Sequence, residues 1–198
     1  MTEPSLTPPK LTLPPAEADA VRLAYGQARV ILEYGSGGST VIAGENPQAQ
    51  VFSVESSADW VVMMQRWFDA HPPQGTVVLH HADIGPTRDW GMPANNRRVG
   101  LWPGYPNSVW DRPDFRQPDT VLIDGRFRLA CFLTVLMRAA GPVKVLWDDY
   151  DGRPGYHSAE RLCRPVARHG RMAEFHVEPQ RLAPNDLPWV IEAFVTPN

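Results

Sequence analysis

The stretch Val30-Ile31-Leu32-Glu33-Tyr34-Gly35-Ser36-Gly37-Gly38-Ser39-Thr40 decides the fold of this chain. Branched apolar residues followed by several glycines are typical of a short buried strand that ends in a tight turn. The turn leads into a short helix, which we expect over residues 40–44. A strand, a glycine-rich turn and a helix in this order are the start of an α/β fold with a parallel sheet.

Strands and helices alternate along the rest of the chain. Two further apolar segments, 172–177 and 189–195, are joined by residues without a helix signal, so we expect these two strands to pair antiparallel. The sequence therefore predicts a three-layer α/β sandwich around a mostly parallel seven-stranded sheet whose last strand is antiparallel. The other expected strands are 30–32, 51–54, 76–79, 118–123 and 143–147, and the other expected helices are 15–28, 56–70, 127–140 and 158–169.

The length of 198 residues predicts a single folded domain, and 43% hydrophobic with 21% charged residues exclude a wholly disordered chain. Residues 1–14 are rich in proline and predict an extended N-terminal arm before a domain that spans 15–198. Residues 84–117 interrupt the alternation with a long segment that has no hydrophobic period, and its aromatic residues argue against disorder.

Composition also limits the cellular setting. The two cysteines, Cys131 and Cys163, exclude a disulfide framework and fit a reducing compartment. No apolar run reaches the roughly 18 residues of a membrane span, and the start Met1-Thr2-Glu3-Pro4 does not look like a signal peptide. A net charge of −3 argues against binding to nucleic acid by bulk attraction. We expect a cytoplasmic protein that binds neither membrane nor nucleic acid, while homo-oligomer formation stays open.

Acidic residues follow most of the predicted parallel strands. Any one of them is as readily explained as a helix cap or a solubilising group. Because the carboxyl ends of parallel strands meet at one edge of a sheet, where ligands bind in such folds, the set as a whole predicts a binding site. These residues are Glu33, Glu55, Asp83, Asp124 and the pair Asp148-Asp149.

The kind of ligand follows from the residues around the glycine turn. A dinucleotide fingerprint requires glycine where this chain has Thr40, and Glu33 would repel a pyrophosphate. Glu33 instead suits a ligand with a positive centre such as an ammonium group. Glu55, twenty positions after Gly35, is placed to accept hydrogen bonds from ribose hydroxyls, and Asp83 is placed to accept one from an adenine amino group.

The chain resembles the class I S-adenosylmethionine-dependent methyltransferases. The resemblance is carried by the antiparallel last strand, the segment Glu33-Tyr34-Gly35-Ser36-Gly37, Glu55 and Asp83. The resemblance spans about residues 21–195. It implies that Glu33 and the backbone of Gly35 and Gly37 hold the methionine part of S-adenosylmethionine, that Glu55 holds the ribose, and that Asp83 holds the adenine. Segment 84–117 departs from the family by replacing a simple helical crossover, so no substrate is implied.

The acids on the later strands are similar to the Mg²⁺ site of catechol O-methyltransferase-like enzymes. This resemblance implies Asp124, Asp148 and Asp149 as metal ligands, and oxygen ligands suit Mg²⁺. Asp149 departs from the family, which has an amide at that position. The alternative is that Arg126 and Arg128 neutralise these acids without a metal.

Other residues are candidates for the substrate side. His157, after the acidic loop, is a candidate for proton transfer beside Asp124 and Asp148, although a lone loop histidine is more often simply solvated. Three aromatics of segment 84–117 together with Arg126 are candidates for a substrate pocket. The alternative is an apolar cluster that fixes the long segment to the sheet. The three aromatics are Trp102, Tyr105 and Trp110.

The leading hypothesis is an S-adenosylmethionine-dependent methyltransferase, or a close relative of one, that acts on a small molecule. A different class of protein is also compatible with the sequence: a non-catalytic cofactor-binding module whose 84–117 segment contacts a partner protein. A nicotinamide-dependent oxidoreductase is disfavoured by Glu33 and Thr40.

Overall fold

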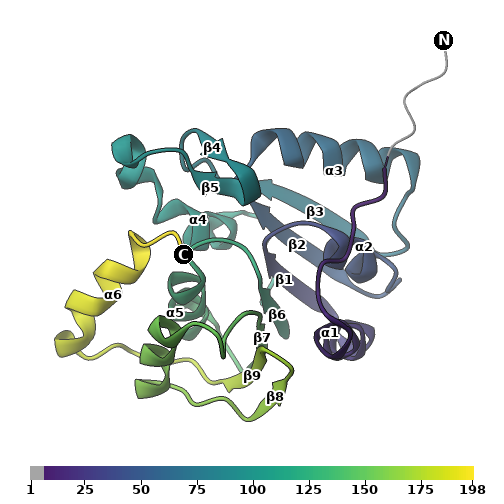
Figure 1. Ribbon diagram of the computed structural model, residues 1–198. Coiled ribbons are helices and arrows are strands. Elements are labelled where there is room, and N and C mark those ends of the chain that lie inside the picture. The colour runs from purple at the N-terminus through teal and green to yellow at the C-terminus, as the bar shows by residue number, and fades with distance from the viewer. Residues whose placement is uncertain (1–6) are drawn as a thin grey trace.

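The computed structural model describes residues 7–198, so the first six residues of the expected N-terminal arm lie outside the described residues (Figure 1). Seven strands form one sheet in the order β3-β2-β1-β6-β7-β9-β8. The sheet confirms the predicted α/β class. Its strands are β1 (Val30–Tyr34), β2 (Gln50–Glu55), β3 (Thr76–His81), β6 (Thr120–Ile123), β7 (Val143–Trp147), β8 (Ala167–His169) and β9 (Met172–Val177).

The strand order reverses between β1 and β6. From β1 the chain continues outward to β2 and β3, whereas β6 leads outward to β7 on the other side. Leu32 of β1 lies opposite Phe52 of β2 and Val121 of β6, and all of these pairs are parallel. In folds of this type the crevice beside such a reversal is the usual ligand site.

The last strand of the chain, β9, runs antiparallel to β7, which confirms a mostly parallel sheet with an antiparallel last strand, although the sequence placed that strand at 189–195. It is inserted between β7 and the short edge strand β8, with which it forms a hairpin turned by Gly170 at φ +59°. This pairing places the start of β9 next to the end of β7, with Ala173 opposite Trp147. The residues of the hairpin turn therefore reach the edge that carries the predicted acids.

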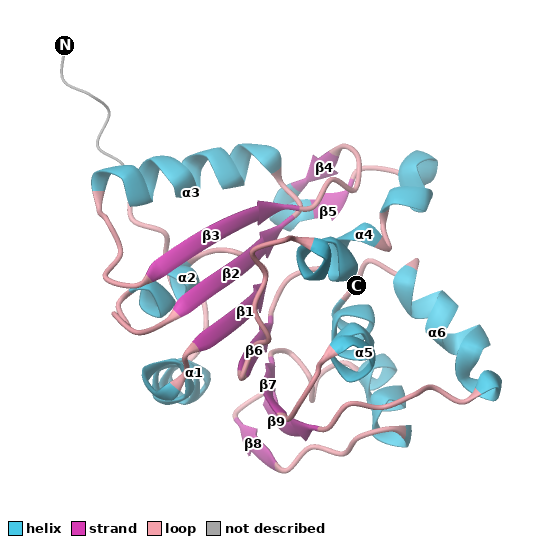
Figure 2. Cartoon of the chain, turned by 180° about the vertical axis from the view of Figure 1, so that it is seen from behind, coloured by secondary structure: helices cyan, strands magenta, loops and turns pink. Residues whose placement is uncertain are grey.

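Helices cover both faces of the sheet (Figure 2). On one face lie α1 (Pro15–Gln27) and α2 (Gly38–Gly44), and α3 (Ala58–Ala70) runs beside the edge strand β3. On the other face lie α5 (Arg128–Arg138) and α6 (Leu187–Phe194). In residues 7–198, no helix combines the length and the apolar character needed to cross a membrane.

Alternation along the buried strands divides the core between the two faces. Ile31 packs with the α1 and α2 side, whereas Leu32 and Tyr34 pack with the α5 side, and all three side chains are fully buried. This explains why β1 is apolar without a two-residue alternation, since neither of its faces meets water.

Segment 84–117 is ordered by short elements. A two-stranded hairpin joins β4 (Thr87–Arg88) to β5 (Met92–Pro93), and α4 (Gly104–Asn107) follows between two 3₁₀ turns. Trp102 and Tyr105 are buried in the main core cluster. The segment therefore forms part of the cover over the α5 face.

Two expected elements were wrong. Residues 189–195 fall largely in α6, because Pro188 suits a first helical turn and Val190 and Ala193 share a buried helical face. The helix expected over 158–169 is a 3₁₀ helix, Pro154–Arg161, followed by strand β8. Strand β8 supplies the seventh strand of the sheet in place of 189–195.

Candidate functional site

The acids predicted to share one edge of the sheet do so. Glu33 stands one residue before the end of β1, Glu55 ends β2, and Asp83 follows β3. Asp124 and Asp148 directly follow β6 and β7. All five strands are parallel, so these residues lie at their common carboxyl edge.

The glycine turn after β1 is pressed against the turn after β6. Gly35 has φ +104°, and its amide donates to the carbonyl of Val54 at 2.8 Å. A Cβ placed on Gly35 would lie 2.8 Å from the backbone nitrogen of Gly125. The hydroxyl of Thr40 accepts the amide of Gly37 at 2.9 Å, so the residue that departs from the dinucleotide pattern closes the turn internally.

Glu33 is fully buried behind this turn. The Tyr25 hydroxyl donates to its Oε1 at 2.7 Å, while its Oε2 is buried and has no hydrogen-bond partner in residues 7–198. Burial raises the pKa of Glu33, and the nearby hydroxyls of Thr40 and Tyr25 act in the opposite direction. A buried carboxylate oxygen without a partner is a feature that a bound donor would satisfy.

Glu55 is held in place by the backbone. Its Oε1 accepts the amides of Ser56 at 2.7 Å and Ser57 at 2.8 Å, and its Oε2 accepts the amide of Ser36 at 3.4 Å. These contacts tie the end of β2 to the glycine turn and favour the start of α3. The Glu55 carboxylate is thus pre-oriented beside the turn.

The β4–β5 hairpin lies directly over Glu55. Its residue Gly91, at φ +68°, accepts a hydrogen bond from the Ser56 hydroxyl at 2.9 Å through its carbonyl. A Cβ on Gly91 would lie 2.9 Å from the Glu55 Oε1. Only glycine allows the hairpin to approach the carboxylate this closely.

A hollow of about 280 Å³, the second cavity, lies on the β3 side of the hairpin. Asp83 is exposed there, and its Oδ1 accepts the Gly85 amide at 2.8 Å. Trp60 is 39% exposed and donates from its indole nitrogen to the Ser36 carbonyl at 2.8 Å. The second cavity is lined by Ser56, Ser57, Ala58, Asp59, His81, Asp83, Gly85, Pro86 and Thr87.

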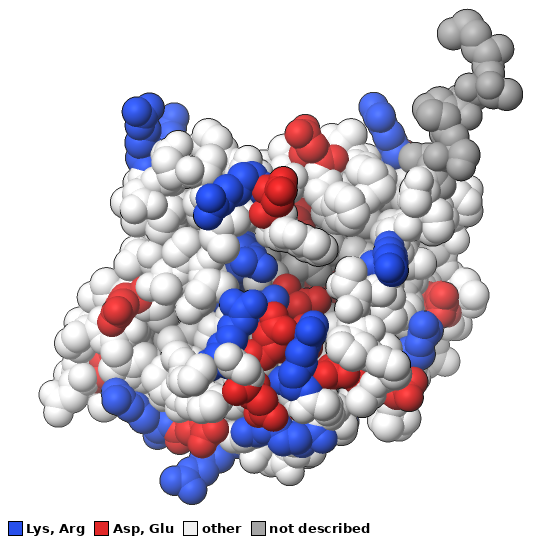
Figure 3. Space-filling view, in the orientation of Figure 1, with Lys and Arg blue, Asp and Glu red and all other residues white. Residues whose placement is uncertain are grey.

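A larger hollow of about 450 Å³, the first cavity, lies on the β6 and β7 side of the hairpin. In Figure 3 the face that carries it is hollowed near its middle, and acidic and basic side chains gather at the border of the hollow. The first cavity is lined by Arg88, Asp89, Trp90, Met92, Asp124, Arg126, Arg128, Asp148, Asp149, Arg153 and Arg171.

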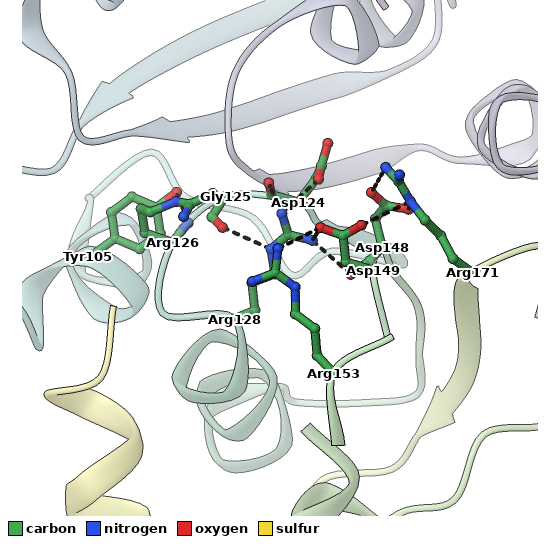
Figure 4. Close-up of polar contacts among 9 residues, drawn as sticks. All are labelled: Tyr105, Asp124, Gly125, Arg126, Arg128, Asp148, Asp149, Arg153 and Arg171. Atoms are coloured by element: carbon green, nitrogen blue, oxygen red, sulfur yellow. Dashed lines mark hydrogen bonds and ion pairs between the residues drawn. The ribbon is translucent and has the colours of Figure 1, made fainter. Parts of the chain in front are cut away.

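Ion pairs link most of these charges (Figure 4). The buried Arg128 lies 3.1 Å from Asp124 and 3.4 Å from Asp149 and also donates to three backbone carbonyls. Arg171 binds Asp148 through two nitrogens, at 2.8 and 3.1 Å. Arg171 and Arg153 also pair with Asp149, at 2.9 and 3.0 Å. The three aspartates after β6 and β7 are thus matched by three arginines.

The carboxyl of Asp124 has a raised pKa. Burial raises its pKa to about 7, the neighbouring carboxylates of Asp148 and Asp149 add to the rise, and Arg128 opposes it. Hydrogen bonds from Arg171 to Asp148 raise the pKa of that guanidinium above its already high normal value. Asp124 therefore changes charge near neutral pH.

Backbone strain gathers around the first cavity. Outside glycine, the positive φ angles among residues 7–198 belong to Trp90 at 61°, Phe127 at 53° and Asp149 at 58°. Trp90 and Asp149 line the first cavity, and Phe127 lies between Arg126 and Arg128, which also line it. Such conformations cost about 1–3 kcal/mol each and cluster at functional sites.

Several predicted site residues do not reach the two cavities. His157 places its Nε2 3.3 Å from the Tyr150 carbonyl and lines neither hollow. Trp102 and Tyr105 are buried in the core, and Trp110 donates from its indole nitrogen to the Tyr34 hydroxyl at 2.8 Å. These aromatics fix segment 84–117 to the sheet, which was the alternative interpretation.

The predicted magnesium site is not found in the described part of the chain. No group of three or more His, Cys, Asp or Glu side chains in residues 7–198 is arranged to hold a metal. Asp124, Asp148 and Asp149 do lie together, but guanidinium groups occupy the positions at which a cation would bind. Of the two arginines suggested as neutralising partners, Arg128 pairs with these acids and Arg126 does not.

Arg153, Arg171 and Trp90 line the first cavity but were not predicted. Arg171 precedes β9, and only the antiparallel pairing of β9 with β7 brings it to Asp148. Gly170, shortly before the predicted strand 172–177, was the available signal, because a glycine before a strand is typical of a turn. Nothing in the sequence marked Trp90 apart from the other aromatics of segment 84–117.

The sheet order, the antiparallel β9 and the glycine turn at the carboxyl edge define the Rossmann-like fold of class I methyltransferases. The chain belongs to the family of the methyltransferase-like protein from Silicibacter pomeroyi DSS-3. The two are 47% identical over 96% of this chain and 99% of that chain, with a TM-score of 0.93. This confirms the resemblance drawn from Glu33-Tyr34-Gly35-Ser36-Gly37.

More distant structures share the fold. The O-methyltransferase TomG from Streptomyces achromogenes, solved with S-adenosylmethionine, is 16% identical, with 89% of this chain and 83% of that chain covered and a TM-score of 0.56. The O-methyltransferase from Bacillus cereus, solved with S-adenosylhomocysteine, is 13% identical, with 88% and 84% covered and a TM-score of 0.56. No protein-family model and no curated protein matches the chain.

Proposed function

We propose that this chain is an S-adenosylmethionine-dependent methyltransferase that acts on a small molecule. The observation that carries the proposal is the position of Glu55: its carboxylate is fixed to the Ser36 amide of the glycine turn, between a hollow at Asp83 and a larger one at Asp124. A cofactor with a base, a ribose and an amino-acid part suits this linear arrangement. Membership in a methyltransferase-like family supports the same conclusion.

The residues at the edge fit that cofactor. The unpartnered Oε2 of Glu33, buried behind the turn, is an acceptor for a charged donor near Gly35 and Gly37. Glu55 is placed to accept ribose hydroxyls. The second cavity would receive the base, with Asp83 accepting from its amino group; Asp83 is exposed and has its Oδ1 occupied by Gly85.

When bound, the cofactor supplies a methyl group activated by a sulfonium centre. The chain would contribute alignment and a proton acceptor, because placing an acceptor atom in line accounts for much of such a rate enhancement. Asp124 lines the first cavity and has a pKa near 7, so it is suited to accept a proton from the acceptor group at neutral pH. Asp148, bound to Arg171 through both oxygens, would position the site.

No step passes through a metal in this proposal. The three carboxylates predicted as Mg²⁺ ligands carry arginine partners, and a divalent cation would have to displace them. His157 likewise has no part, since it lines neither cavity.

Calorimetry with S-adenosylhomocysteine tests the cofactor part of the proposal. Glu55→Ala is a poor probe, because Glu55 also holds the amides of Ser56 and Ser57. Gly37→Ala is better: its φ of 173° suits any residue, and a Cβ there meets no atom within 4 Å. Asp83→Asn changes an exposed side chain of the second cavity.

We expect wild type to bind S-adenosylhomocysteine, with affinity at least fivefold weaker in Gly37→Ala and Asp83→Asn, since each removes or blocks a direct contact. The matched control is Asp19→Asn, an exposed residue of α1, which should bind like wild type. Wild type without measurable binding would overturn the proposal.

The non-catalytic binding module stays as the second candidate. Val99 and Leu101, in segment 84–117, are 41% and 38% exposed and offer apolar surface to a partner protein. Against it, Trp102 and Tyr105 are turned into the core, so the segment presents no continuous aromatic face. Cofactor binding without turnover of any acceptor, together with a partner lost in Leu101→Ser, would favour the module.

A cytoplasmic location is part of the proposal. It is supported by the thiols of Cys131 and Cys163, both of which are free.

A further inference from the structure

The charges that line the first cavity do not balance. Five arginines and four aspartates line it, so one positive charge is left over when all are ionised. Three arginines are matched with the three aspartates after β6 and β7. Arg88 and Asp89 are neighbours on the exposed hairpin. Arg88 lies on the exposed hairpin, so Arg126 is the partly buried arginine of the first cavity that has no ion pair among residues 7–198.

Arg126 has no partner for its side chain. Among residues 7–198 it forms no ion pair, and its Nε is buried without a hydrogen bond. Burial and the nearby Arg128 guanidinium lower the pKa of Arg126. A buried donor without an acceptor costs about 1–3 kcal/mol, and more when it is charged. An anion beside the guanidinium would remove that cost.

The backbone fixes Arg126 close to the glycine turn. It follows Gly125, which packs against Gly35, and its amide lies 3.4 Å from the Tyr105 hydroxyl. Phe127, next in the chain, has a left-handed backbone. Figure 4 shows Arg126 beside Tyr105, at the opposite end of the charged group from Arg171. It is the arginine of the first cavity that adjoins the turn on which the proposed function places the cofactor.

We propose that Arg126 binds the carboxylate of a small monoanionic methyl acceptor in the first cavity. That the ligand is a methyl acceptor rests on the proposed function, whereas the anion site itself rests on the cavity alone. A planar guanidinium with free donors pairs with a carboxylate through two parallel hydrogen bonds.

The same cavity indicates what the rest of the ligand is like. A carboxylate offers two acceptor oxygens in one plane, which match the parallel donors of the unpaired Arg126 guanidinium. Trp90, which is 80% exposed, and Met92 line the hairpin side and provide apolar surface for a ring or short chain. The ligand class is therefore an organic acid with an aromatic or aliphatic body.

The test uses benzoate as the probe and benzamide as its neutral isostere, with binding followed by ligand-detected NMR on the full chain without cofactor. We expect benzoate to bind wild type and benzamide to bind at least tenfold more weakly. In Arg126→Gln, benzoate affinity should fall at least tenfold, with Arg126→Lys between the two because it keeps the charge without the fork. Arg97→Gln, an exposed arginine outside the cavity, should bind benzoate like wild type.

Equal benzoate binding by wild type and Arg126→Gln would overturn the proposal, and so would the absence of benzoate binding to wild type. Inorganic phosphate that binds more tightly than benzoate and is lost in Arg126→Gln would overturn the carboxylate assignment. A thermal melt of each variant ensures that only folded protein is compared. Failure of S-adenosylhomocysteine to bind is a separate result: it would remove the methyltransferase proposal while the benzoate result still decides the anion site.

Discussion

Gly35 and Gly125 touch backbone to backbone where the strand order reverses. A Cβ on Gly35 would lie 2.8 Å from the nitrogen of Gly125, and a Cβ on Gly125 would lie 2.8 Å from the nitrogen of Gly35. The turns after β1 and β6 thus meet without a side chain between them. This contact fixes the glycine turn relative to Asp124 and Arg126, which flank Gly125 in the chain.

The first prediction concerns the stability of this contact. Gly35→Ala should lower the free energy of unfolding by about 2–4 kcal/mol, because alanine is strained at φ +104° and its Cβ meets the Gly125 backbone. Gly37→Ala, two residues on, should change it by less than about 1 kcal/mol, since its Cβ would enter open space. Urea denaturation of both variants is the measurement, and equal losses would show that the contact does not set the turn.

The second prediction compares two aspartate–arginine pairs. Asp148 is buried and binds Arg171 through two nitrogens, so Asp148→Asn should cost about 2–3 kcal/mol of stability, discounted because Arg171 is partly exposed. Asp151 pairs with Arg168 at 2.7 Å on the surface, and Asp151→Asn should cost less than about 1 kcal/mol. Chemical denaturation of the two variants measures both losses of stability. Similar losses would mean that the buried pair stabilises the fold no more than the surface pair does.

The third prediction uses the raised pKa of Asp124. Between about pH 4 and 7 the folded state holds a proton on Asp124 that the unfolded chain, with a pKa of about 3.9, has released. This contribution therefore favours folding at low pH and is lost as pH rises through about 7. Because of this group, the free energy of unfolding of wild type should fall by about 2 kcal/mol over that pH range. The same fall should be absent in Asp124→Asn.

Denaturation curves at several pH values, with Asp19→Asn as the control, measure the difference between the profiles. Profiles of wild type and Asp124→Asn that run parallel from pH 4 to 8 would mean that Asp124 ionises normally in the folded protein. The proposed role of Asp124 as a proton acceptor near neutral pH would then lose its basis.

Residues within one strand and its turn made the sheet predictable. The apolar run at 30–32, its glycines and the acids after the other strands require only local chemistry and the rule that parallel strands end at one edge. The segment 189–195 was mistaken for a strand because a short apolar run fits both a strand and a buried helix face. Its burial against α5 decides between them, and this contact is far away in the sequence.

The candidate site was likewise predictable from the sequence only in part. Glu55 and Asp124 could be placed at the edge from their strands, but their partners could not. Arg171 reaches Asp148 only through the β9 pairing, and Gly91 reaches Glu55 only through the fold of segment 84–117. The balance of arginines and aspartates in the first cavity, which decides against the metal hypothesis, could therefore not be predicted from the sequence.

The last prediction concerns the hairpin over Glu55. A ligand that extends from the second cavity to the glycine turn must pass Gly91, whose carbonyl accepts the Ser56 hydroxyl and whose Cα faces the Glu55 carboxylate. On this view, the hairpin and the ribose compete for the same surface. Part of the binding free energy is then spent on moving the hairpin, which lowers the apparent affinity.

Gly91→Ala separates the two effects. A Cβ there would clash with the Ser56 hydroxyl and strain a backbone at φ +68°, so the hairpin should be pushed away from Glu55. We expect a loss of about 1–3 kcal/mol in stability together with S-adenosylhomocysteine affinity several-fold tighter than wild type. Calorimetry on Gly91→Ala and on Gly100→Ala, whose Cβ meets no atom within 4 Å, makes the comparison. Weaker binding by Gly91→Ala would mean that the hairpin is part of the ligand site and does not compete with it.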